Sequence, residues 1–241
     1  MKHLAAGFSW LPVAVISLAV VVLVTAGCSG KNSPSESAQV VANDVAVRQQ
    51  FNSYKQMLAL HRPELAVAVG EGIISKYPGT PEAAEVEKAL PGLKAEAEKA
   101  RLAGLWLYQG VKTTGLSGGL QYTAIIESSQ PTGANQVQLI LRRHEGWPEA
   151  VYLYGSGHGF VCKDTCDVVM RIDGKREVWK AYLPDTGEPA MLFKNEKAFI
   201  VTLSKSKAIE MDVTTKDHGP ETLTYEVGGF DPAQFKQLPK K

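Results

Sequence analysis

The sequence predicts an α+β fold, in which a helical hairpin and a connecting helix precede an antiparallel β-sandwich or open barrel. Two observations predict it. From Asn43 to about Gly104, apolar residues recur every three or four positions, which is the period of a helix with one buried face. From Leu105 to Phe235, apolar and polar residues alternate and no long helical pattern intervenes, which favours antiparallel over parallel strands.

Residues 43–104 should form three helices, of which the first two make the hairpin. Pro63 suits the first turn of the second helix, where its missing N–H would have had no helical partner. Thr80 followed by Pro81 is the pattern of an N-cap and a first helical residue, so a third helix should begin there. Pro91 should kink or split this third helix, because proline removes a helical hydrogen bond.

Eleven segments of residues 105–235 are expected to be strands: 105–112, 120–128, 136–143, 150–155, 159–162, 167–172, 178–183, 190–193, 198–203, 208–213 and 222–227. In the third of these, Val137, Leu139 and Leu141 face opposite to Gln136, Gln138 and Arg142, which is typical of a strand with one buried face. Asp173-Gly174 is a hairpin signal. Short connections of this kind predict a meander, and residues 236–241 are left as a tail.

The first 27 residues have the parts of a secretory signal. Lys2 gives a basic start, an apolar run from Phe8 to Val24 follows, and small residues come before Cys28. The run is too short for a permanent membrane span, which needs roughly 20 apolar residues. Residues 28–42 are polar and rich in Ser, so we expect them to form a flexible tether.

Ala26-Gly27-Cys28 resembles the lipobox of bacterial lipoproteins. That resemblance implies that Cys28 carries acyl chains such as palmitate and becomes the mature N-terminus. Each buried methylene contributes about 0.8 kcal/mol, so several acyl chains would hold the protein on the membrane. By the same resemblance, Ser29 favours the outer membrane of a Gram-negative bacterium, with the protein facing the periplasm. An ordinary cleaved signal and an uncleaved anchor remain as alternatives.

Residues 65–90, LAVAVGEGIISKYPGTPEAAEVEKAL, resemble a tetratricopeptide-type unit of envelope lipoproteins in outer-membrane assembly. The resemblance covers about one and a half helix pairs, whereas such arrays need about three repeats to be stable alone. Two interpretations stay open: helices that pack on each other or on the β-domain, and a peptide-binding array. The strand spacing of residues 105–235 also resembles small all-β domains of secreted bacterial proteins, which implies a fold and no activity.

Charge argues against nucleic-acid binding. The chain has 26 Lys and Arg against 25 Asp and Glu, and removing the leader with Lys2 leaves 25 against 25. No basic stripe stands out, so the counterion release that drives nucleic-acid binding is missing. The sequence predicts no cofactor and no metal.

Cys162 and Cys166 are predicted to form a disulfide, because Cys28 is assigned to the lipid and the compartment would be oxidising. The loop they close is short, so the gain in stability is at the low end, about 2 kcal/mol. A metal site that includes His158 and a redox-active pair are the alternatives. Gly157 and Gly159 disfavour the helix that would align His158 with the cysteines.

No catalytic residue is predicted. Ser156, His158 and Asp164 lie too close in sequence to converge as a hydrolase triad. The glycine-rich segment 115–119 lacks the ending of a phosphate loop and is expected to be a turn. The remaining histidines are expected at the surface or in loops: His61, His144 and His218.

Four residues in and beside the glycine-rich loops are candidates for binding a partner: Trp147, Tyr154, His158 and Phe160. Trp and Tyr are enriched at the energetic centres of protein interfaces, although core packing is the simpler role for such residues. We therefore expect a non-catalytic envelope lipoprotein whose β-domain binds another envelope protein, as an inhibitor, an immunity protein or an accessory subunit does. The alternative is a periplasmic enzyme that acts on envelope material, with His158 and nearby acids as its chemistry.

Overall fold

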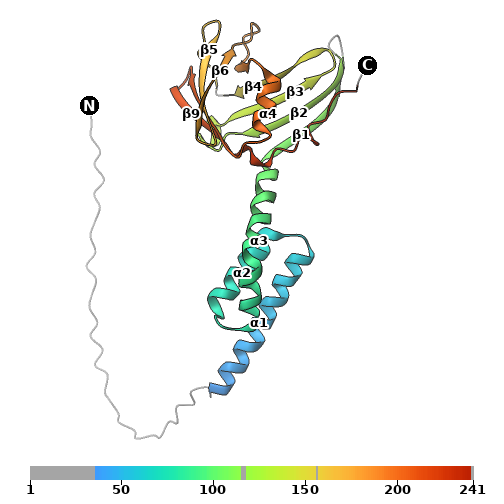
Figure 1. Ribbon diagram of the computed structural model, residues 1–241, viewed down its shortest axis with the longest axis vertical. Coiled ribbons are helices and arrows are strands. Elements are labelled where there is room, and N and C mark those ends of the chain that lie inside the picture. Colours follow the sequence, from blue (N-terminus) through green and yellow to red (C-terminus); the bar gives the residue numbers. More distant parts are fainter. Residues whose placement is uncertain (1–35, 115–117, 156, 240–241) are drawn as a thin grey trace, which may run out of the picture. The chain divides into compact units, whose positions relative to one another are not determined.

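The computed structural model describes residues 36–114, 118–155 and 157–239 (Figure 1). Three helices come first, α1 (Glu36–Ala59), α2 (Pro63–Lys76) and α3 (Pro81–Gly104). Nine strands follow: β1 (Trp106–Thr113), β2 (Gly119–Glu127), β3 (Val137–His144), β4 (Trp147–Gly155), β5 (Cys166–Ile172), β6 (Lys175–Tyr182), β7 (Ala190–Phe193), β8 (Ile209–Thr215) and β9 (Gly219–Tyr225). Helix α4 (Glu196–Leu203) lies between β7 and β8, and two short 3₁₀ turns are η1 (Gly133–Asn135) and η2 (Val227–Gly229). The α+β class is confirmed.

The tether prediction is wrong at its C-terminal end. Helix α1 begins at Glu36, so residues 36–42 are helical rather than extended. The reason is composition: Glu, Ala and Gln are strong helix formers, and here they run directly into the amphipathic stretch that follows. The signal segment, Cys28 and residues 29–35 lie outside the described residues.

The three helices share a small core, made of Val47, Tyr54, Ala66, Ile73, Ala83, Val86 and Leu93. Gly70 permits the close approach of α2 to its neighbours, because a Cβ there would lie 2.8 Å from a methyl group of Val86. Helix α3 runs through Pro91 as one element, so the expected split is absent. Leu93 is buried against the hairpin, and this packing outweighs the lost hydrogen bond.

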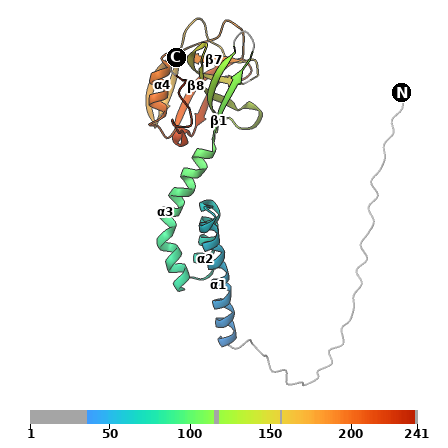
Figure 2. The same cartoon turned by 90° about the vertical axis from the view of Figure 1, so that its right-hand side faces the viewer.

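The nine strands form one antiparallel sheet in the order β1-β2-β3-β4-β7-β6-β5-β8-β9 (Figures 1 and 2). This confirms the predicted antiparallel sheet folded as an open barrel. The sheet curls because residues after β2 reach β9: the Ser129 N–H donates to the Thr224 carbonyl over 2.7 Å, and the Thr224 N–H donates to Gln130 over 2.9 Å. The hydroxyl of the buried Tyr225 donates to the Val137 carbonyl over 3.1 Å, which ties β9 to β3 across the core.

The core lies on one face of the sheet, as the alternation predicts. Val137, Leu139 and Leu141 are all fully buried there. Phe230 and Phe235 of the C-terminal segment pack against the same core beside Trp106, with the Phe230 and Trp106 ring centroids 5.0 Å apart. Within the described residues, no helix is both long enough and apolar enough to cross a bilayer.

Two predicted strands are wrong. Residues 198–203 belong to α4, in which Phe199 and Leu203 point one helical turn apart into the core while Val201 is 53% exposed. The apolar, partly β-branched run 198–203 suits a short buried strand as well as a helix, and tertiary packing decides. Residues 159–162 form only an isolated bridge, Phe160 with Thr215, because Gly157 and Gly159 have positive φ angles that break a strand.

Candidate functional site

The face of the sheet opposite the core carries the first candidate site, on β3 and β4. Register places Ile140 opposite Tyr152, and Arg142 lies on the same face. The Arg142 guanidinium carbon lies 4.9 Å from the centroid of the Trp147 ring and 5.6 Å from that of Tyr152. Since a cation over an aromatic face is attracted to its π electrons, Arg142 holds both rings. We call Ile140, Arg142, Trp147 and Tyr152 the β3–β4 face.

His144 is buried, with 1% of its surface exposed, so the expectation of a surface position is wrong. Its ring stacks on Trp147 with centroids 4.1 Å apart. Its Nδ1 accepts the Gly146 N–H over 3.0 Å, so in the neutral ring Nε2 carries the proton and faces the Thr113 hydroxyl at 3.2 Å. The Thr113 hydroxyl in turn donates to the Gly119 carbonyl over 2.9 Å.

Trp147 is therefore fixed on two sides and still 42% exposed. A large side chain that is already ordered loses little conformational entropy when it enters an interface. Beside it, burial raises the pKa of Tyr152, which keeps its hydroxyl neutral near Arg142. The β3–β4 face thus offers one fixed indole, one neutral phenol and one cation.

Of the other three predicted partner-binding residues, Phe160 and His158 do not join this face, and Tyr154 lies at its far end. Phe160 is 1% exposed and belongs to the core, which corrects that prediction. Tyr154 is 42% exposed and follows Tyr152 on the same side of β4, but it is seven residues from Trp147, which is about 23 Å in a strand. His158 lies in the loop after β4, and its side chain is 85% exposed.

Asp217 fixes His158. One carboxylate oxygen accepts the His158 backbone N–H over 2.8 Å, and the other lies 2.5 Å from Nδ1 of the ring. These two bonds lower the pKa of Asp217. The geometry orients the imidazole with Nε2 free to meet solvent, which is an arrangement that general bases use.

Cys162 and Cys166 lie at disulfide distance, with 2.20 Å between the sulfur atoms and 5.6 Å between the Cα atoms. The predicted pairing is thus present, and it links the segment that buries Phe160 to the first residue of β5. Because both thiols are in the disulfide, they cannot serve the alternative metal site with His158. Across the described ranges, no group of three potential metal ligands is found.

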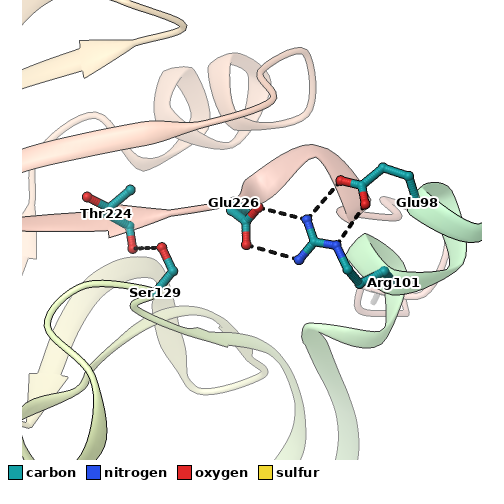
Figure 3. Close-up of polar contacts among 5 residues, drawn as sticks. All are labelled: Glu98, Arg101, Ser129, Thr224 and Glu226. Carbon is teal, nitrogen blue, oxygen red and sulfur yellow. Dashed lines mark hydrogen bonds and ion pairs between the residues drawn. The ribbon is translucent and has the colours of Figure 1, made fainter. Parts of the chain in front are cut away.

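A second candidate site lies where α3 meets the β-domain (Figure 3). The Arg101 guanidinium makes two hydrogen bonds to Glu226, of 2.7 and 3.1 Å, and two of 2.8 Å to Glu98. These bonds lower the pKa of both carboxyls. A hollow of about 400 Å³ lies beside this pair, lined by Leu105, Leu107, Ile125, Gln138 and others.

The helices have a larger hollow of about 690 Å³ between α2 and α3, lined by Glu64, Val67, Lys94, Ala97 and Arg101 among others. It bears on the tetratricopeptide interpretation, because arrays of that kind bind peptides in a groove between helices. With its mixed charges, Glu64 and Lys94, it points to no particular ligand, so the two interpretations of the helical segment both stand.

No protein-family model, curated protein or solved structure matches this chain. In its described residues the chain is an α+β protein, with a three-helix segment followed by a nine-stranded open sheet.

Three features of these sites are not predicted from the sequence: the burial of His144, the stacking of Arg142 on Trp147 and Tyr152, and the Arg101–Glu226 pair. The tight turn from His144 to Trp147, with its central glycine, was the available signal for the stack. Arg101 and Glu226 are 125 positions apart, and no local pattern marks them as partners.

Proposed function

We propose that this protein is a non-catalytic envelope lipoprotein, anchored through Cys28, whose β-domain binds another envelope protein. The lipobox resemblance supports the anchor and the outer-membrane, periplasm-facing location. The paired Cys162 and Cys166 support an oxidising compartment, because disulfides are rare where thiols are kept reduced.

The observation that carries the binding role is the exposed Trp147, fixed between His144 and Arg142. Trp, Tyr and Arg dominate the energetic centres of protein interfaces, and all three types occur on the β3–β4 face. An inhibitor or immunity protein and an accessory subunit are the two kinds of protein that this role fits.

Site-specific photocrosslinking in the native envelope tests the proposal. A photoreactive residue in place of Tyr152, beside Trp147, should capture one protein, and the additional change Trp147→Ala should abolish the adduct. The matched control is a photoreactive residue at Val201, which is 53% exposed on α4, the helix that packs on the core side of the sheet, opposite the β3–β4 face. Capture of glycan or lipid at Tyr152, with no protein, would refute a protein-binding role.

The anchor has a separate test. The intact mass of the chain from membranes should correspond to residues 28–241 plus acyl groups, and Cys28→Ser should release the chain from the membrane. A mass that still includes Met1 and no lipid would remove both the anchor and the assigned location.

A second candidate function, an enzyme acting on envelope material, is favoured by the His158–Asp217 pair. An imidazole held at Nδ1 by a carboxylate is oriented for proton transfer at Nε2. The two functions differ in which residue matters. His158→Ala should abolish turnover of envelope material under the enzyme hypothesis and leave partner capture unchanged under the binding hypothesis.

A further inference from the structure

Strand β1 forms an open edge of the sheet. In the described part of the chain, β2 is the one strand that pairs with it, over all eight residues from Trp106 to Thr113. An antiparallel strand paired on one side directs the N–H and C=O groups of alternate residues away from its neighbour. The edge of β1 therefore presents a row of backbone donors and acceptors.

The sequence of β1 itself gives this edge none of the usual protections, and the C-terminal segment contacts the strand on the core side, where the Asp231 N–H donates to the Tyr108 hydroxyl over 2.6 Å. Proteins guard exposed edges with charged residues, proline or bulges, because a bare edge pairs with other chains. Residues 106–111 carry no charge and no proline, and the pairing of β1 with β2 has no bulge. Leu107 and Val111 are 53% and 45% exposed. The sole charged residue of β1 is Lys112, near the end of the strand.

The opposite edge of the sheet is treated differently. Strand β9 contains Pro220 and Glu221, and Thr224 is covered by the bridge to Gln130. Of the two edges that the strand order leaves, β9 is thus guarded and β1 is bare. Such a contrast within one sheet indicates that something covers β1 in the working protein.

The sequence of β1 is complementary to itself. If two antiparallel copies of β1 meet about a two-fold axis at Gln109, each Leu107 faces Val111 of the second copy, and the two Gln109 amides face each other. All of these residues lie on the face away from the core, since the alternate residues Trp106 and Tyr108 pack on the core. Cross-strand pairs of this kind stabilise a sheet when apolar meets apolar.

The other face of the strand also fits. In the same register Tyr108 faces Gly110 of the second copy, so the largest central residue meets the smallest. A hollow of about 430 Å³ lies along this side, lined by Tyr108, Gly110 and Tyr122 and by Gln234 and Lys236 of the C-terminal segment, and the Tyr122 ring of the same chain lies over Gly110. No pair among residues 107–111 places two bulky or two charged side chains together.

We propose that two copies of this chain associate through β1, antiparallel and centred on Gln109, to form one continuous sheet. The proposal does not rest on the partner-binding role of the β3–β4 face, from which β1 is separated by β2. The dimer covers both bare edges at once, and the β3–β4 face of each copy stays open.

Single cysteines in the full chain in its native membrane test the register. Facing residues across an antiparallel pair have Cβ atoms about 4.5–5.5 Å apart, within reach of a disulfide. Gln109→Cys should therefore give a disulfide-linked dimer on a non-reducing gel. Leu107→Cys alone and Val111→Cys alone should not, because like residues there are separated by roughly 13 Å of strand, but the two variants expressed together should crosslink.

A second measurement guards against a folding artefact. Leu107→Asp with Val111→Asp places like charges opposite each other and should raise the dissociation constant of the dimer about tenfold or more, measured by sedimentation of the full chain in detergent. Val201→Asp, at an exposed position on α4, is the matched control and should change nothing. In the crosslinking experiment the unchanged chain, which already contains Cys28, shows how much disulfide-linked dimer forms without an introduced cysteine.

Three outcomes would overturn the proposal. They are a monomeric Gln109→Cys chain, equal crosslinking of all three single-cysteine variants, and an adduct of Gln109→Cys with a different protein. The last outcome would assign the β1 edge to a strand from another chain.

Discussion

Gly229 should tolerate no side chain, because it lies against the last turn of α3. A Cβ at this position would lie 2.5 Å from the Ala103 nitrogen and closer still to the Leu102 carbonyl. These are backbone atoms of a helix, so they cannot rotate away as a side chain would. Gly229→Ala must therefore push α3 off η2, and with it the Arg101–Glu226 pair of Figure 3.

The cost can be bounded from the geometry. Overpacking of a well-packed contact costs typically 1–3 kcal/mol, and we take about 2 kcal/mol for one methyl group against rigid backbone. In a chain of this size 1 kcal/mol shifts the melting temperature by roughly 2–4 °C, so the expected drop is roughly 4–8 °C.

Gly228→Ala is the matched control, one residue away, because its Cβ would meet nothing closer than 3.4 Å. Both variants are compared with the unchanged chain by thermal and urea unfolding, and hydrogen exchange at the end of α3 reports whether the contact opens locally. The prediction is refuted if the two variants have the same melting temperature and hydrogen exchange at the end of α3 is the same in Gly229→Ala as in the unchanged chain. In that case α3 and η2 are not in the close contact described.

Two further predictions concern buried and turn positions. The Asp173 carboxylate accepts the Lys207 and Ala208 N–H groups, which lowers its pKa below the ordinary 3.8. The stability it contributes is therefore present above that ordinary value and is lost as pH falls through the lowered pKa. Asp173→Asn should accordingly reduce the urea midpoint at pH 7 and converge with the unchanged chain in strong acid. Tyr225→Phe should cost about 1 kcal/mol in urea unfolding, because Val137 keeps a second hydrogen bond to its carbonyl.

Each of these two predictions can be contradicted by the unfolding measurements. A gap between Asp173→Asn and the unchanged chain that is as large at pH 2 as at pH 7 would mean that the ionised carboxylate is not the stabilising species. A loss above about 3 kcal/mol for Tyr225→Phe would mean that the hydroxyl does more than supply one of two bonds to a satisfied carbonyl.

The parts of the fold that the sequence predicted are those in which short-range pattern and burial agree. In β8, Ile209, Met211 and Val213 alternate with polar residues, and all three are buried in the sheet. The α4 segment lacks such agreement. Its apolar run suits a strand or a helix, and the choice depends on the core beneath Phe199 and Leu203, which no local pattern contains.

In the candidate sites, too, some features follow from the local sequence and others depend on residues far away in the chain. Spacing and compartment were enough to pair Cys162 with Cys166, since few other partners were available. Residue type alone could not predict that Trp147 is exposed and Phe160 is buried. Phe160 is buried because it bridges to Thr215, which lies 55 positions later, whereas Trp147 sits at a turn beside His144.

Whether an aromatic side chain can contribute to binding therefore depends on its exposure and on the neighbours that hold it, and not on residue type alone. An exposed aromatic ring that is free to rotate must be ordered at binding, and this ordering offsets part of its apolar contribution. Trp147 is ordered beforehand by a buried histidine whose own ring is fixed by the Gly146 N–H. Tyr154, equally exposed, has no such stacking partner among the ring contacts of the described residues. If the β-domain binds a protein through this side of the sheet, replacing Trp147 should weaken binding more than replacing Tyr154, although both expose the same fraction of their surface.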